Sequence, residues 1–191
     1  MRADWYKKSV ETLASIYERY ASHDVMQGSD KGTVHSYVEE YERLLAPYRQ
    51  GSTVLEIGVM SGASMQMWQE YFVDSTVIGV DVTDRLLQER YKTPPFHLVI
   101  SDSTNPEILK KLQGHTFDVV MDDGCHIAEA QIRTFFLLKP MMRPGSLYII
   151  EDVAYIDHVG RVFRSMHPTC EIIDNRHVKG RSDDVLVIYR F

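Results

Sequence analysis

Five short apolar runs follow one another after Gly51, and this rhythm most constrains what the chain can fold into. None of the runs alternates polar with apolar residues, so each suits a strand that is buried on both faces. Strand and helix in alternation predict right-handed crossovers and a parallel sheet. The runs are 53–58, 76–81, 96–100, 117–121 and 146–150, separated by amphipathic segments near 62–72, 84–90, 105–113 and 127–142.

The two ends of the chain follow other patterns. Runs at 170–174 and 184–189, joined by 175–183 with no helix between them, predict an antiparallel hairpin. In the first fifty residues, apolar positions recur every three or four residues, as in amphipathic helices. The first predicted helix carries Trp5, Val10, Leu13, Ile16, Tyr17 and Tyr20, and the second carries Tyr37, Tyr41, Leu44 and Leu45.

These patterns predict an α/β protein with one compact domain. We expect a Rossmann-like doubly wound sheet, mostly parallel with a C-terminal antiparallel hairpin, plus N-terminal helices. Residues 1–50 would form a helical cap, and residues 51–191 the ligand-binding domain. A length of 191 residues suits one such domain.

Charge and cysteine content narrow the partners. A net charge of −6 argues against nucleic acid, because phosphate binding favours a basic face. No apolar run approaches the roughly 20 residues that span a bilayer, and the first residues do not form a signal peptide. Cys125 and Cys170 are too few for a disulfide framework or zinc cluster. We expect a cytoplasmic protein with a small-molecule partner and no nucleic-acid or membrane partner; a homo-oligomer stays open.

Acidic residues stand at the end of nearly every parallel run. In open α/β sheets, ligands bind outside the carboxyl ends of the strands, where the strand order reverses. The sequence therefore predicts carboxylates around a ligand crevice. Helix capping could account for one such acid, but not for seven: Glu56, Asp81, Asp102, Asp122, Asp123, Glu151 and Asp152.

The turn E-I-G-V-M-S-G at residues 56–62 brings backbone close to the expected ligand. It lacks the G-x-G-x-x-G signature, which argues against a nicotinamide dehydrogenase. Asp81 ends the second run, where an acid can accept hydrogen bonds from ribose hydroxyls. Asp102 and Ser103 end the third run and could border the adenine.

Four motifs together resemble class I S-adenosylmethionine-dependent methyltransferases. More narrowly, they resemble the metal-dependent antibiotic-sugar O-methyltransferases and the related cephalosporin-hydroxylase-like proteins. The resemblance covers roughly residues 29–191, and D-K-G at 30–32, with His35 and Tyr37, resembles a segment that lies over the cofactor in that group. The four motifs are V-L-E-I-G at 54–58, G-V-D at 79–81, D-D-G-C-H at 122–126 and E-D at 151–152.

The resemblance implies an O-methyltransferase that acts on a hydroxyl of a small molecule, a sugar or another natural-product acceptor. It implies that Asp122, Glu151 and Asp152 bind Mg²⁺ or another hard divalent cation, and that His126 is the catalytic base with Asp123 close by. The S-adenosylmethionine site would comprise Lys31, His35, Glu56, Gly58, Gly62, Asp81, Asp102, Ser103 and Asp122.

The chemistry of O-methylation explains why such residues are needed. An alcohol is a poor nucleophile until its proton leaves, and a cation with an imidazole base can remove that proton. Plainer interpretations stay open: His126 as a helix-start residue, and Glu151 with Asp152 as solvated loop charge. A non-methylating, hydroxylase-like enzyme and a non-catalytic cofactor-binding subunit are the alternative functions.

Overall fold

The computed structural model describes residues 11–191. Trp5 and Val10, predicted to belong to the first helix, lie outside the described residues. Helix α1 (Leu13–Tyr17) is capped by Thr12, whose side-chain oxygen accepts a hydrogen bond from the backbone N–H of Ser15. Among the described residues, no helix combines the length and the apolar character needed to cross a membrane.

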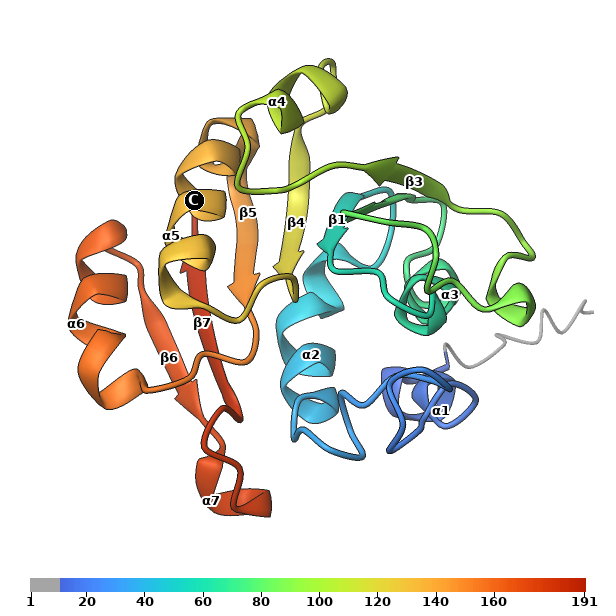
Figure 1. Ribbon diagram of the computed structural model, residues 1–191, viewed down its shortest axis with the longest axis horizontal. Helices are drawn as coiled ribbons and strands as arrows, with labels where there is room; N and C mark the ends of the chain where they lie inside the picture. The colour runs from blue at the N-terminus through green and yellow to red at the C-terminus, as the bar shows by residue number, and fades with distance from the viewer. Residues whose placement is uncertain (1–10) are drawn as a thin grey trace, which may run out of the picture.

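Seven strands form one sheet in the order β3-β2-β1-β4-β5-β7-β6, and Figure 1 shows β1, β4, β5, β7 and β6 following one another in this order. The first five strands run parallel, and β7 pairs antiparallel with both β5 and β6. This arrangement confirms the predicted Rossmann-like sheet with its C-terminal hairpin. The strands are β1 (Thr53–Ile57), β2 (Thr76–Asp81), β3 (His97–Ile100), β4 (Phe117–Asp122), β5 (Met142–Ile150), β6 (Glu171–Asp174) and β7 (Val185–Arg190).

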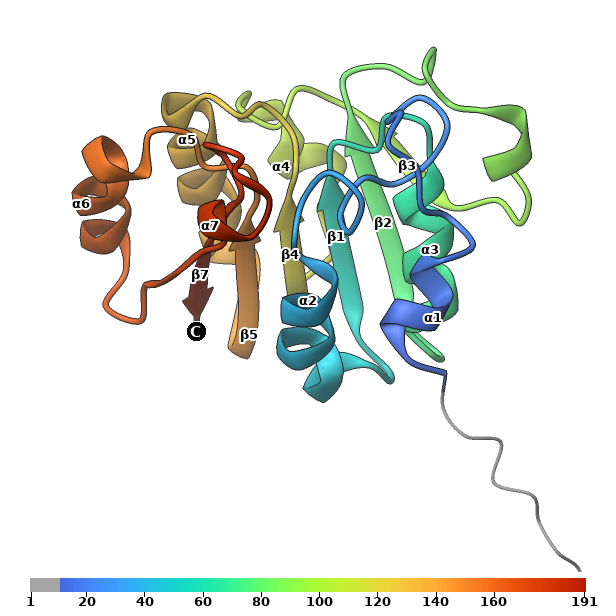
Figure 2. The same cartoon turned by 90° about the horizontal axis from the view of Figure 1, so that it is seen from below.

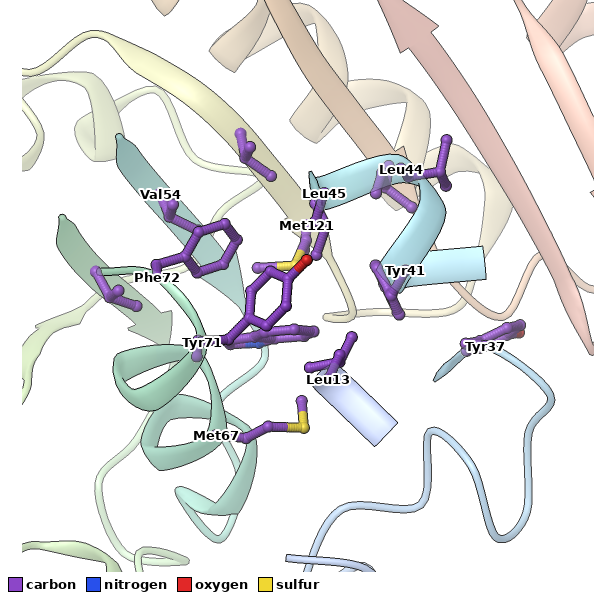
Figure 3. Close-up of a cluster of buried hydrophobic side chains, with 14 of the residues drawn as sticks. Leu13, Tyr37, Tyr41, Leu44, Leu45, Val54, Met67, Tyr71, Phe72 and Met121 are labelled. Atoms are coloured by element: carbon purple, nitrogen blue, oxygen red, sulfur yellow. The ribbon is translucent and has the colours of Figure 1, made fainter. Parts of the chain in front are cut away.

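Helices cover both faces of the sheet. In Figure 2, α2 lies in front of β1 and β4, while α4 and α5 lie on the far side of the sheet, α4 near β4 and α5 near β5 and β7. One core cluster joins α1, α2 and α3 to the sheet, and Figure 3 shows Leu45, Tyr71 and Met121 meeting in it. A second cluster joins α4, α5 and α6 to the other face. The helices are α2 (Val38–Leu45), α3 (Ala63–Tyr71), α4 (Glu107–Lys111), α5 (Ala128–Leu138) and α6 (Ile156–Met166).

Two predicted connections were wrong, and one helix was missed. Residues 84–90 do not form a helix; a single 3₁₀ turn, Glu89–Tyr91, is found there. The hairpin connection contains a short helix, α7 (Arg176–Lys179), which Gly180 ends at φ 72°. Helix α6 was not predicted, although its apolar residues recur with helical spacing. Phe163 and Met166 are among those that it buries.

The sheet reverses its strand order between β1 and β4, and the loops after these strands pack against each other. The N–H of Asp123 donates to the carbonyl of Ile57 at 2.9 Å. Gly58, at φ +86°, lies so close to this loop that an added Cβ would stand 2.0 Å from the carbonyl oxygen of Asp123. No residue with a Cβ fits at position 58, so the loop after β1 is held against the loop after β4.

Gly58→Ala is therefore expected to destabilise the fold by more than about 3 kcal/mol, since the clash adds to the roughly 1–2 kcal/mol cost of positive φ. Urea unfolding measures this. Gly114→Ala is the matched control: Gly114 has φ +90° with nothing within 4 Å of an added Cβ, so the φ cost alone applies. Equal losses in the two variants would contradict the close-packing argument.

Candidate active site

A cavity of about 360 Å³ opens at the carboxyl ends of β1, β2 and β4. Gly58, Asp81, Asp123, His126 and Asp152 are among the residues that line it. A second cavity, of about 210 Å³, adjoins it beyond β2 and β3 and shares Gly58, Asp81 and Gly124. The predicted crevice at the reversal of strand order is therefore present, with two adjoining parts.

Asp81 holds the glycine turn in place. Its Oδ2 accepts hydrogen bonds from the N–H groups of Val59 (2.9 Å) and Met60 (3.0 Å), and Oδ1 accepts from the N–H of Thr83 at 3.1 Å. The carboxylate lines both cavities. Since each carboxylate oxygen has two lone-pair sites, Asp81 can also accept bonds from a ligand.

Glu56 lies beneath the turn, outside both cavity linings. Its carboxylate accepts hydrogen bonds from Ser64 Oγ (2.8 Å) and Trp68 Nε1 (2.9 Å). Burial raises the pKa of Glu56 to about 7, although Lys31 and these donors oppose the shift. Gly62 precedes α3 at φ 90° and supports the same turn.

Asp102 and Ser103, which were predicted to border the adenine, line the second cavity. Asp102 Oδ1 accepts from the N–H and the hydroxyl of Thr104, and these bonds lower the pKa of Asp102. Ser103 Oγ lies 3.1 Å from Thr134 Oγ1 of α5. The two side chains thus line the smaller cavity, whereas His126 lines the larger one.

Asp123, His126 and Asp152 converge in the larger cavity. Each offers one ligand atom, and these atoms lie within 4.8 Å of one another. His126 Nε2 is 3.3 Å from Asp123 Oδ1, and Nδ1 is 3.5 Å from Asp152 Oδ2. The hydrogen bond with Asp123 raises the pKa of His126 to about 9 against the effect of burial. Burial raises the pKa of Asp152 to about 7.

Lys31 reaches the same acids from the N-terminal segment. Its Nζ donates to Asp123 Oδ2 at 2.7 Å and to both oxygens of Glu151 at 2.7 and 2.8 Å. Burial would lower the pKa of Lys31, but Asp123, Glu151 and Glu56 together hold it well above the usual value. For Glu151, burial is the main cause of a raised pKa.

Asp122, predicted as both a metal and a cofactor residue, turns away from the cavities. It is 2% exposed, and its Oδ2 accepts a hydrogen bond from Tyr148 Oη at 3.3 Å. Burial raises its pKa to about 7. Glu151 is likewise buried and does not line either cavity, but Lys31 donates hydrogen bonds to both Glu151 and Asp123. The geometry therefore favours Asp123 over Asp122 beside Asp152.

Tyr37 was grouped in the sequence with D-K-G and His35, in the segment that resembles one lying over the cofactor. It is fully buried and its hydroxyl donates to Asp152 Oδ1 at 2.7 Å. His35, predicted to bind the cofactor, stacks on Tyr37 with ring centroids 5.0 Å apart and lies outside the cavity lining. Burial lowers its pKa. The sequence signal for a functional role of this segment was its D-K-G-x-x-H-x-Y pattern. These polar residues are not needed to form the amphipathic helix that follows.

The chain resembles antibiotic-sugar methyltransferases in sequence. It is 38% identical over 136 residues to the 8-demethyl-8-alpha-L-rhamnosyl tetracenomycin-C 2'-O-methyltransferase of Streptomyces olivaceus, covering 66% of this chain and 35% of that protein. It is 34% identical over 132 residues to the demethylmacrocin O-methyltransferase of Streptomyces fradiae, covering 64% and 33%. The chain thus spans about a third of the curated relatives it matches.

Solved structures agree on the fold. The MycE methyltransferase of the mycinamycin biosynthetic pathway, in complex with Mg and SAH, superposes with a TM-score of 0.71 at 22% identity, covering 94% of this chain and 55% of that one. A methyltransferase-domain family model matches residues 55–153, more than half of the chain and the part that contains the glycine turn, Asp81, Asp123, His126 and Asp152. The chain belongs to this methyltransferase-domain family.

Proposed function

We propose that this chain is an S-adenosylmethionine-dependent O-methyltransferase that methylates a hydroxyl of a small molecule with the help of a divalent cation. One observation carries the proposal: Asp123, His126 and Asp152 converge on a cavity beside the glycine turn. The tetracenomycin and macrocin relatives are named as O-methyltransferases, so the acceptor class we favour is a sugar hydroxyl of a natural product.

The crevice offers a place for each part of the cofactor. We assign the ribose to Asp81, which lines both cavities, and the adenine to the smaller cavity with Asp102 and Ser103. The methionine part would then lie in the larger cavity, between the turn at Gly58 and the side chain of Lys31. Glu56 and Gly62 shape the turn, and we assign no contact to Asp122 or His35.

The residues fit a hard divalent cation. Asp123 and Asp152 face the cavity, Glu151 adjoins Asp123, and such carboxylate oxygens are the donors that Mg²⁺ and Mn²⁺ prefer. We propose Asp123, Glu151 and Asp152 as the residues that hold it. When bound, the cation supplies positive charge that lowers the pKa of an acceptor hydroxyl. Tyr37 fixes the orientation of Asp152 through its hydroxyl.

We assign to His126 the removal of the acceptor's proton. It lines the cavity next to Asp123, and its side chain is 44% exposed, so an acceptor that enters from solvent can reach it. In the metal-free protein its pKa of about 9 keeps it protonated at neutral pH. Proton removal therefore requires that the negative charge of Asp123 be offset.

A transfer assay tests the function. Purified protein is incubated with Mg²⁺, methyl-labelled S-adenosylmethionine and a panel of glycosides with free hydroxyls, and products are identified by mass spectrometry. The expected product is a methyl ether, formed on at least one acceptor together with S-adenosylhomocysteine. Tight cofactor binding with no transfer to any hydroxyl would instead favour a binding subunit, and no cofactor binding would overturn the proposal.

Asp81→Ala should weaken S-adenosylmethionine binding by about 1–3 kcal/mol, since the ribose hydroxyls lose their acceptor and the glycine turn loses its support. Titration calorimetry measures the change. Asp84→Ala is the control, because exposed Asp84 lies in the same loop outside the cavity linings. Unchanged affinity in Asp81→Ala would remove Asp81 from the cofactor site.

A further inference from the structure

Lys31 is a buried lysine whose ammonium group lies among the carboxylates proposed to hold the cation. Its side chain is 2% exposed, and Nζ lies 2.7 Å from Asp123, 2.7 Å from Glu151 and 3.8 Å from Glu56. Lysine is almost never buried in this way unless acids pair with it. The negative charge of these acids therefore holds the ammonium in the interior.

Lys31 uses the same oxygen atoms that a divalent cation would need. Asp123 Oδ2 and both oxygens of Glu151 accept its hydrogen bonds, while Asp123 Oδ1 faces His126. Mg²⁺ binds carboxylate oxygens at about 2.0–2.1 Å, well inside an ammonium hydrogen bond, and two cations at such separations repel strongly. Lys31 and a divalent cation are thus competitors for the same acids.

The side chain of Lys31 has room to move, whereas the backbone around it is tightly held. Its side chain lines the cavity of about 360 Å³, and its four-carbon stem is flexible. The backbone that follows is held by Tyr17, whose hydroxyl oxygen accepts from the N–H groups of Gly32 and Thr33 at 2.8 Å each. A Cβ on Gly32 would come within 2.6 Å of Tyr17 and 2.7 Å of Val38, so the segment is tightly packed.

We propose that Lys31 is a built-in counter-cation: its ammonium holds Asp123 and Glu151 in the metal-free protein and moves into the cavity when a divalent cation binds. The inference rests on the proposed function, because it requires that these acids take such a cation. Lys31 then has two effects. It stabilises the fold of the metal-free protein, and it weakens metal binding through competition.

Lys31→Met separates these effects, because methionine keeps much of the stem and removes the charge. We expect the variant to unfold several degrees lower in EDTA, to bind Mn²⁺ at least about tenfold more tightly by calorimetry, and to gain more thermal stability from Mg²⁺ than the wild type. Lys179→Met is the matched control. Lys179 Nζ donates to the carbonyls of Gly32 and His35 at 2.5 Å, so its loss perturbs the same segment and leaves Lys31 in place. We expect its Mn²⁺ affinity to stay within about twofold of the wild type.

Lysine labelling of the wild-type protein provides a second measurement if Lys31→Met does not fold without metal. Reductive methylation followed by peptide mass spectrometry should modify Lys31 slowly in EDTA and faster in saturating Mg²⁺, with Lys179 as the internal reference. An unchanged Lys31 rate would overturn the inference.

The binding results distinguish this inference from the cation assignment itself. Mn²⁺ binding that Lys31→Met leaves unchanged or weakens, or that Lys179→Met tightens equally, overturns the counter-cation role alone. If neither the wild type nor Lys31→Met binds Mn²⁺, the cation part of the proposed function fails, and the inference fails with it.

Discussion

Replacing His126 by alanine is expected to lower the rate of methyl transfer by about 10²–10⁴-fold, with the cofactor affinity within a few fold of the wild type. His126 Nε2 faces Asp123 and Nδ1 faces Asp152, so the ring stands between the two acids at the cavity. Single-turnover rates with a methyl acceptor measure the loss, and calorimetry measures cofactor binding. His158→Ala is the control, because His158 is exposed on α6.

The pH dependence distinguishes a base from a structural residue. Neutral imidazole accepts a proton and imidazolium does not, so the wild-type rate should rise with pH through the pKa of His126 and level off above it. His126→Ala should lose this rise. Asp123 raises the pKa of His126 to about 9 without metal, so the midpoint under assay conditions reports how far a bound cation offsets Asp123. A folded variant with wild-type rate and pH profile would remove His126 from the mechanism.

Removal of the divalent cation is expected to abolish turnover while cofactor binding stays largely intact. Asp123→Asn should mimic chelation, because it removes charge from the acid that both Lys31 and His126 contact. We expect loss of measurable Mn²⁺ binding and a rate at least about 10³-fold below the wild type. Full activity of exhaustively chelated protein would contradict the cation assignment.

Asp122→Asn is the matched comparison for this prediction. It changes the adjacent residue in the same way, but Asp122 contacts Tyr148 outside the cavities. Burial raises its pKa to about 7, so about half of this carboxyl is already uncharged at neutral pH and the neutral amide changes its charge less. The variant should retain Mn²⁺ binding. If Asp122→Asn loses Mn²⁺ binding and Asp123→Asn keeps it, Asp122 is the metal ligand, as the resemblance in sequence implied, and Asp123 is not.

The pattern of apolar and acidic residues along the chain is enough to predict the parallel sheet and the position of the site. Runs such as 76–81 and 117–121 carry apolar residues on both faces, which is typical of strands buried in a parallel sheet, and both form such strands here. Because parallel strands end at one edge, Asp81, Asp123 and Asp152 had to gather there. The connections between strands could be predicted less well. The polar 84–90 segment has helical periodicity but little apolar surface to bury, so it forms only a 3₁₀ turn. Helix α6 forms because one of its faces packs against the sheet.

The tertiary structure decided which acid of each adjacent pair faces the cavity. Successive side chains at the end of a strand point to opposite sides, so Asp122 packs toward Tyr148 while Asp123 reaches Lys31 and His126. The periodicity of a strand shows that the side chains of Asp122 and Asp123 point in different directions, but it does not show on which side the cavity lies. Lys31 and Glu151 are 120 residues apart in sequence, and their contact depends on how the N-terminal segment packs over the sheet. A buried ion pair of this kind is fixed by the packing around it, because the charges are favourable there only when all their partners are in place.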